Sequence, residues 1–361
     1  FDEPWLTLHW RAEGKIEYAA LLYIPSTAPF DLYHPERHHG VKLYVKRVFI
    51  TDRAEELVPR YLRFLRGVID SEDLPLNISR EMLQHNPVLA RIRAGVISRV
   101  LSELEKKAKD DADAYGAFWT SFGPVLKEGL YEGTDHRDTL LGLARFHSTQ
   151  NPNQWIALAD YVGRMKPGQD AIFYIAGDDA GTLASSPQLE GYAKRGVEVL
   201  LLTDPIDEFW VASVGRYQDK PFKSVTRGGA DLDKIPLPEG ADAKKDDRPA
   251  ENDIGALVAL FRLALKDAVK DVRVSQRLTE SAVCLVADDQ DLDIHLERLL
   301  RQHKQIDQAA KRILEINPDH ALIRALSADV KKPGASDRLG DIAQLLLDQA
   351  RIAEGDPVPD P

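Results

Sequence analysis

Residues 171–214 have the sequence AIFYIAGDDAGTLASSPQLEGYAKRGVEVLLLTDPIDEFWVASV, and this stretch decides the fold class. Its apolar runs at 171–176 and 197–202 have the composition of buried strands, and helical patterns follow them at 187–194 and 207–214. Strands that alternate with helices pair in parallel, because the helix returns the chain to the edge of the sheet where the first strand began. We therefore predict a small α/β unit here.

The sequence before this unit is rich in strands first and in helices later. β-Branched and aromatic residues between Gly, Pro and Asp predict strands over 5–10, 16–24 and 41–50. Helical periodicity predicts helices over 55–68, 80–107, 113–126 and 139–146. The longest of these helices has one apolar stripe at three- and four-residue steps, formed by Leu89, Ile92, Val96, Val100 and Leu104.

Residues 234–253 are the best domain boundary in the chain. They hold prolines and Lys–Asp clusters without any periodicity. A compact α+β pattern follows, with helices over 254–268 and 292–303, strands over 272–278 and 312–316, and an apolar run over 282–287. We expect Asn317 to cap the next helix, with Pro318 in its first turn, and Ser336 to begin the last helix.

Composition excludes several classes of protein. The 361 residues suit two or three domains. Lys plus Arg is 47 and Asp plus Glu is 58, so the net charge of −11 argues against broad nucleic-acid binding. Cys284 is the one cysteine, which rules out an intrachain disulfide and a cysteine-based zinc site and fits a reducing compartment. Without a run of about 18 apolar residues, we expect no membrane span, no signal peptide and a cytoplasmic location.

Both ends of the sequence are typical of a fragment. The chain opens with FDEP just before a predicted strand, and it closes with GDPVPDP, which has the composition of a linker. We expect further sequence on both sides.

The segment LPLNISREMLQ at 74–84 suits phosphate binding. Asn77 and Ser79 are good N-cap residues, and a long helical pattern follows them. Arg80 and Gln84 are four residues apart and so share one face of its first turn. Free N–H groups at a helix start favour an anion, and a guanidinium adds paired donors. The alternative is that Arg80 is only a salt-bridge partner, and spacing alone favours that alternative.

Other chemistry-bearing groups have simpler explanations. The loop from His34 to His39 could suggest a metal site, but its histidines lack a regular spacing, so we predict no metal. Cys284 lies in an apolar run and is expected to be an inert core residue.

Two apolar features are harder to place in a core. Phe209 and Trp210 are adjacent, so they point about 100° apart on a helix. A second feature is a stripe formed by Leu292, Leu296, Leu299 and Leu300. For both features, spacing alone favours ordinary core packing.

Four stretches carry a resemblance to a known family. They are LLYIPSTAPFDL at 21–32, KLYVKRVFI at 42–50, DLPLNISREMLQ at 73–84 and EVLLLTDPIDE at 198–208. Over its whole length the chain resembles the middle and C-terminal domains of the 90-kDa heat-shock protein chaperones, in their bacterial form.

The resemblance implies a multidomain chain that combines α/β and α+β folds. The αβα middle domain would span 1–233, with a large α/β part at 1–110, a helical connector at 111–166 and a small α/β part at 167–233. A linker at 234–253 would lead to a small α+β dimerisation domain at 254–361, without the last helix of the family pattern. In its final helix, Leu339, Ile342, Leu346 and Ala353 lie at offsets that suit a bundle seam, which we predict to be the dimer interface.

The resemblance also implies a function in protein folding and the stress response. ATP and Mg²⁺ would be bound by a domain before Phe1, and Arg80 would reach the γ-phosphate with Asn77 and Gln84 as neighbours in its loop. Client proteins would bind over Phe209, Trp210 and the leucine stripe, so we expect the stripe to be largely exposed, together with at least one of the two aromatics. A homodimer and further chaperone partners are also implied, but no nucleic acid and no membrane. We expect no ATP hydrolysis by the chain alone.

Two other functions stay open at this point. The chain could be a dimeric scaffold in which Arg80 is structural. It could also be an independent phosphate-transfer or metal enzyme that uses Arg80 and the loop from His34 to His39.

Overall fold

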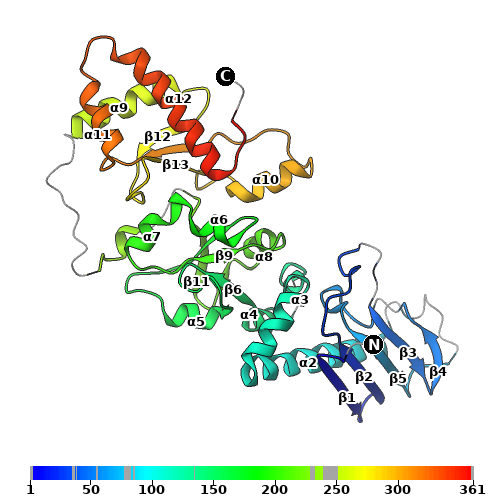
Figure 1. Cartoon of the computed structure of the whole chain (residues 1–361). Helices are drawn as coiled ribbons and strands as arrows, with labels where there is room; N and C mark the ends of the chain where they lie inside the picture. The colour runs from blue at the N-terminus through cyan, green and yellow to red at the C-terminus, as the bar shows by residue number, and fades with distance from the viewer. Residues whose placement is uncertain are drawn as a thin grey trace. The chain divides into compact units, whose positions relative to one another are not determined.

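The computed structural model describes residues 3–34, 37, 39–53, 56–76, 83, 86–133, 135–227, 232–238 and 251–358. The chain forms two compact units. Unit 1 consists of residues 1–145 and 209–214, and unit 2 consists of residues 146–208 and 215–361. Both units mix helices with sheets, so the multidomain α/β and α+β class is confirmed (Figure 1).

Unit 1 contains a five-stranded sheet in the order β1-β2-β5-β3-β4. The strands are β1 (Leu6–Ala12), β2 (Tyr18–Ile24), β3 (Gly40–Val45), β4 (Val48–Thr51) and β5 (Arg66–Ser71). Only β3 and β5 pair in parallel in this sheet. In β2 every second residue from Tyr18 to Ile24 is buried, which is the pattern of a strand with one face on the core.

The predicted strand at 41–50 is a hairpin instead. It consists of β3 and β4, joined at Lys46 and Arg47. Both joining residues have positive φ, 48° and 67°, which is the conformation of a tight two-residue hairpin turn. Glycine or asparagine usually marks such a turn, and neither is present.

The predicted helix at 55–68 is wrong. Pro59 is extended there, and only Arg60–Leu62 form a short 3-10 helix, η1, before β5 begins at Arg66. Proline has no N–H to donate inside a helix. The apolar residues of this segment are buried on all sides rather than along one stripe, and they are Leu57, Val58, Tyr61, Leu62, Phe64 and Leu65.

Helices α2 (Pro87–Asp110), α3 (Ala112–Tyr131) and α4 (Arg137–Leu143) complete the larger part of unit 1. The predicted stripe of α2 is buried from Leu89 to Leu104, as expected. Asn86 caps the helix by accepting from the N–H groups of Val88 and Leu89. A side chain at Gly95 would place its Cβ 2.4 Å from the Tyr18 hydroxyl, so glycine lets α2 approach β2 closely.

Unit 2 begins with a six-stranded sheet in the order β10-β11-β8-β9-β6-β7. Its strands are β6 (Arg145–Ser148), β7 (Ile156–Ala157), β8 (Ile172–Ala176), β9 (Leu200–Leu202), β10 (Arg216–Tyr217) and β11 (Lys220–Ser224). β8 pairs in parallel with both β9 and β11, which confirms the small α/β unit. The predicted helix at 139–146 ends at Leu143, because Phe146 belongs to β6.

Short helices and one longer helix connect these strands. They are α5 (Leu158–Gly163), α6 (Ala180–Ala184), the 3-10 helix η2 (Pro187–Leu189), α7 (Glu190–Lys194) and α8 (Asp207–Val214). The last of these has the predicted bounds; its residues 209–214 belong to unit 1. A further 3-10 helix, η3 (Leu232–Lys234), follows β11.

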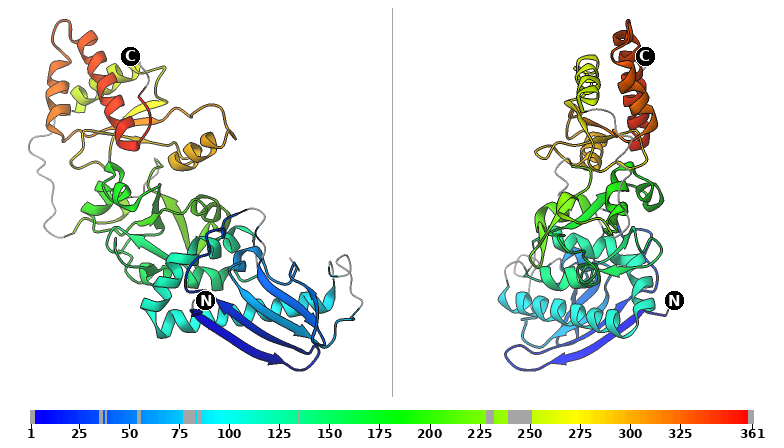
Figure 2. Two further views of the ribbon diagram at one scale, coloured as in Figure 1. Left: turned by 45° about the vertical axis from the view of Figure 1, so that its right-hand side comes forward. Right: turned by 90° about the vertical axis from the view of Figure 1, so that its left-hand side faces the viewer.

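The rest of unit 2, coloured yellow to red in Figure 2, is an α+β arrangement. Its three-stranded sheet has the order β12-β14-β13. Its elements are α9 (Glu251–Ala264), β12 (Asp271–Val274), β13 (Val283–Val286), α10 (Ile294–Gln302), β14 (Ile313–Ile316), α11 (Ala321–Asp329) and α12 (Ala335–Glu354). α12 packs against both α9 and β13. The expected cap at Asn317 is wrong: His320 caps α11, and the Asn317 side chain donates to the Ser281 carbonyl at 2.9 Å.

None of the helices formed by the described residues is long and apolar enough to cross a membrane.

Candidate functional site

The predicted phosphate-binding residues Asn77, Arg80 and Gln84 lie outside the described residues. The structure describes what precedes and follows them. Leu74 and Leu83 are buried, whereas Leu76 is 53% exposed. The Ser71 hydroxyl accepts from the Leu74 N–H at 3.3 Å, so the chain leaves β5 in a side-chain-stabilised turn. The predicted role of Arg80 therefore stays a prediction.

The loop from His34 to His39 shows no metal-binding geometry in its described part. His39 is buried, and its Nδ1 accepts from the Val41 N–H at 3.2 Å, while His38 lies outside the described residues. Nowhere in the described ranges do three or more His, Cys, Asp or Glu side chains come together as a metal site would need. Cys284 is buried in β13, and this burial raises its thiol pKa well above the usual value. We conclude that Cys284 is an unreactive core residue.

Helix α10 carries the leucine stripe, and the stripe is only partly exposed. Leu292 is 40% exposed, just before the helix, while Leu296, Leu299 and Leu300 are half-buried. The expectation of a largely exposed stripe is therefore too strong. The helix face turned to the interior holds Ile294 and, unexpectedly, Glu297. The Glu297 carboxylate can be buried because it pairs with Arg312 at 2.9 Å and accepts from the Ala310 N–H.

The start of α10 is tied to the small α/β part of unit 2. Asp293 caps the helix through the His295 N–H at 3.1 Å. Its other carboxylate oxygen accepts from the hydroxyl groups of Ser224 and Thr226, the latter at 2.7 Å. Because Asp293 is only 2% exposed, these charge-assisted bonds compensate for its burial.

His295 adds a second tie between the same parts. Its Nδ1 lies 3.0 Å from Glu208 Oε1, and its Nε2 lies 3.2 Å from Asp178 Oδ1. Burial raises the pKa of Glu208 to about 7, and the nearby Asp293 and Asp207 add to this rise against the lowering effect of His295. Burial opposes charge on His295, but hydrogen bonds to Glu208 and Asp178 outweigh it and raise the histidine pKa. At neutral pH this pair of groups holds a proton between α8 and α10.

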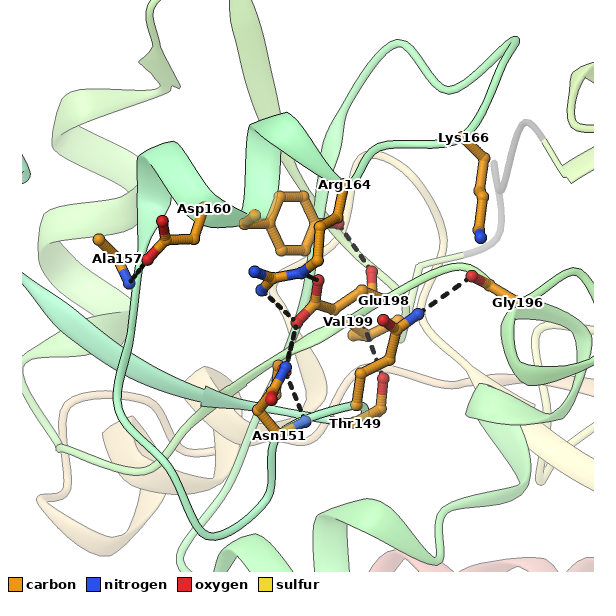
Figure 3. Close-up of polar contacts among 12 residues, drawn as sticks. Thr149, Asn151, Ala157, Asp160, Arg164, Lys166, Gly196, Glu198 and Val199 are labelled. Atoms are coloured by element: carbon orange, nitrogen blue, oxygen red, sulfur yellow. Dashed lines mark hydrogen bonds and ion pairs between the residues drawn. The ribbon is translucent and has the colours of Figure 1, made fainter.

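A third polar cluster lies beside the six-stranded sheet of unit 2 (Figure 3). Arg164 approaches the buried Glu198 carboxylate with two donors, at 2.9 and 3.0 Å. Ser148 and Asn151 donate to the same carboxylate, at 2.5 and 3.3 Å. Four donors satisfy one buried charge here, so the cluster is structural and ties β6 and α5 to the start of β9.

Of the two aromatics predicted to contact clients, only Phe209 has exposed surface. Phe209 is half-buried and stands edge-on to Tyr131 at 6.0 Å. Trp210 is fully buried, with no exposed side-chain area, so its placement on a client-binding surface is wrong for this conformation. The expectation that at least one of the two aromatics is exposed is therefore met only in part, by Phe209.

The predicted dimer seam on α12 is mostly intramolecular core. Leu339 and Leu346 are buried in a cluster with Leu257 and Phe261. Ile342 packs on the edge of that cluster and Ala353 is exposed. Leu339 and Leu346 are therefore not available to a second chain.

A different apolar face of α12 is open. Leu345 and Ile352 are each 67% exposed and seven residues apart, so they lie on one side of the helix with Ile342. Sequence analysis missed this face because α12 has two apolar stripes. The spacing did contain a signal for this face. One stripe of α12, formed by Leu339, Ala343, Leu346 and Ala350, is enough to pack on the core, so the second apolar stripe remains for another contact.

The comparisons with known proteins agree on one family. The sequence pattern described as Hsp90 protein matches residues 1–361. The chain is 59% identical to Chaperone protein HtpG of Paramagnetospirillum magneticum over 361 residues, and 54% identical to that of Roseobacter denitrificans over 363 residues. Each match covers 100% of this chain and 58% of the relative, so the chain spans less than two thirds of these proteins. Because the family pattern covers every residue, this chain belongs to the Hsp90 family.

Proposed function

We propose that this chain is the part of an ATP-dependent chaperone that binds client proteins and completes the ATPase site of a domain upstream. The observation that carries the proposal is the match to Hsp90 protein across residues 1–361, together with relatives that are named chaperones. What the structure adds is a surface on which the client part of the proposal can be tested.

Client binding is assigned to α10 and the residue before it. A chaperone needs an apolar surface that tolerates many sequences, and exposed apolar side chains supply burial without directional demands. Leu292 is exposed, and Leu296, Leu299 and Leu300 each keep some exposed surface. Asp293 and His295 fix the start of the helix, so the leucines are presented from a defined position.

Completion of the ATPase site is assigned to Arg80. ATP and Mg²⁺ would be held by the upstream domain, and Asn77 and Gln84 would position the loop. A guanidinium that meets the γ-phosphate only when the domains close stabilises the transition state more than the bound ground state. It would therefore affect hydrolysis much more than nucleotide binding.

The ATPase part is tested in a protein that joins this chain to an ATP-binding domain. We expect Arg80→Ala to slow hydrolysis, by up to roughly 10³-fold, with unchanged ATP affinity. Arg80→Lys should restore little, because the planar pair of donors is lost. Arg91→Ala is the matched control, since Arg91 is an exposed arginine of α2. Unchanged turnover in Arg80→Ala would mean that Arg80 is only structural and would favour the scaffold function.

Dimerisation is assigned to the open face of α12. Leu345 and Ile352 expose two large apolar side chains on one side of a twenty-residue helix. Helices that expose such a stripe bury it by packing against another helix. A second copy of the same helix would bury it in a symmetric contact.

A further inference from the structure

A cavity of about 340 Å³ lies in the C-terminal part of unit 2. It is bounded by α10, α12, the segment at 309–312 and the chain after α12. Its apolar lining is formed by Val269, Leu285, Ile294, Leu347 and Val358. A cavity with this lining favours a ligand with an apolar body.

The charged residues of the lining are mainly basic. Two are acidic, Glu297 and Asp356, and five are basic: Arg298, Arg301, Lys311, Arg312 and Arg351. This excess of positive charge occurs in a chain whose net charge is −11. It is a local feature that overall composition does not predict.

Three of the basic residues already form ion pairs or hydrogen bonds within the chain. Arg312 pairs with Glu297 at 2.9 Å, and Arg351 pairs with Asp348 at 2.9 Å. Arg298 donates to the Glu354 carbonyl and pairs with Asp356 at 3.2 Å. These contacts hold the walls of the cavity together.

The other two basic residues, Arg301 and Lys311, are exposed and have no acidic partner within the described part of the chain. The cavity thus has two exposed basic side chains beside its apolar lining.

We propose that this cavity binds a small amphiphilic carboxylate. The apolar body would cover the floor near Leu285 and Leu347, and the carboxylate would lie between Arg301 and Lys311. A carboxylate accepts from both groups, whereas an ammonium group at the same position would be repelled by both. The site is separate from the leucine stripe, because none of the four stripe leucines lines the cavity. It therefore does not depend on the proposed function.

The test compares octanoate with octylammonium, which share the apolar chain and differ in head-group charge. Calorimetric titration of the whole chain should find one octanoate site, with octylammonium bound at least about tenfold more weakly, because partly exposed charges contribute modestly. In the double variant Arg301→Glu, Lys311→Glu the preference should reverse. High salt should weaken octanoate binding in the unchanged chain.

Lys194→Glu is the matched control, since Lys194 is an exposed lysine of α7 outside the cavity. It should leave octanoate binding unchanged. Arg301→Gln, Lys311→Gln is the milder variant if the double reversal changes the melting temperature, and it should still lose most octanoate binding. Equal binding of the two probes by the unchanged chain would overturn the proposal. So would octanoate binding that survives both double variants.

Discussion

Glu208 and His295 are two ionisable side chains whose charges depend on each other. Both are largely buried, and they share a hydrogen bond at the start of α10. Asp178, Asp293 and Asp207 are the other charged groups that act on this pair. The environment favours a proton at this position, because a buried carboxylate and three nearby acidic groups disfavour another negative charge.

The pair should make the fold less stable as the pH rises. The Glu208 pKa is raised from 4.5 to about 7, so between these values the folded state holds a proton that the unfolded state has lost. The raised pKa of His295 acts in the same direction, since its contribution is complete below 6.5 and is lost as the pH rises through the folded value. The full Glu208 shift corresponds to at most about 3 kcal/mol.

Glu208→Gln tests this linkage. The variant removes the titrating carboxyl but keeps an acceptor for His295, so melting temperature should fall less steeply between pH 5 and pH 8 than in the unchanged chain. The pKa of His295, measured by NMR titration, should also fall, because the negative charge of Glu208, which raises it, is gone. An unchanged His295 pKa would show that the contact does not form in solution.

Arg164 is the second residue with a sharp prediction. Arg164→Ala leaves the Glu198 carboxylate buried with two of its four donors, so we expect a loss of about 1–3 kcal/mol in the free energy of unfolding. The control Arg164→Ala, Glu198→Gln should recover part of this loss, because the uncompensated charge is removed. Urea denaturation monitored in unit 2 measures both. Equal stability of all three proteins would contradict the account of this cluster.

At the scale of elements, helices with one apolar stripe could be predicted from the sequence. Segments whose apolar residues are buried on all sides could not. The stripe of α2 and the α/β alternation at 171–214 follow directly from spacing. The helix predicted at 55–68 is wrong because the apolar residues of this segment are buried in the core although the chain there is irregular. Pro59 already argued against a helix. The prediction of the dimer seam on α12 was wrong for a different reason. The helix has two apolar stripes, and only tertiary packing shows which one is covered.

Substitutions in the two stripes of α12 should have opposite effects on stability and on dimerisation. Leu339→Ala should cost about 2–5 kcal/mol of stability, because it opens a cavity in the core without touching the open face. Leu345→Asp, Ile352→Asp should leave the melting temperature nearly unchanged and abolish concentration-dependent dimerisation. Denaturation and sedimentation measure the two effects. Dimerisation that persists in the Leu345 and Ile352 variant would refute this interface.

At the scale of the whole molecule, the sequence was informative about the family and less so about the client-binding surface. Four motifs were enough to identify the family, and the match to Hsp90 protein confirms it. Which apolar residues are open could not be read from amphipathicity, because Trp210 is buried in the folded chain and Leu296, Leu299 and Leu300 are half-buried. Burial against distant segments leaves no local signal in the sequence.

The central claim is that α10 and Leu292 bind non-native proteins. The most direct measurement is titration of the 361-residue chain with a fluorescently labelled, permanently unfolded protein. Leu292→Asp, Leu300→Asp should weaken binding at least about tenfold, since each covered leucine contributes on the order of 1.5–3 kcal/mol at best. Leu263→Asp is the matched control, because Leu263 is a 71% exposed leucine on α9.

We expect the control to bind like the unchanged chain and all three proteins to melt at similar temperatures. Leu292→Asp alone serves if the double variant melts early, because Leu292 is the most exposed leucine of the stripe and its replacement does not disturb the core. Unchanged binding by both Leu292 variants, or equal losses in Leu263→Asp, would contradict the claim that this surface binds clients.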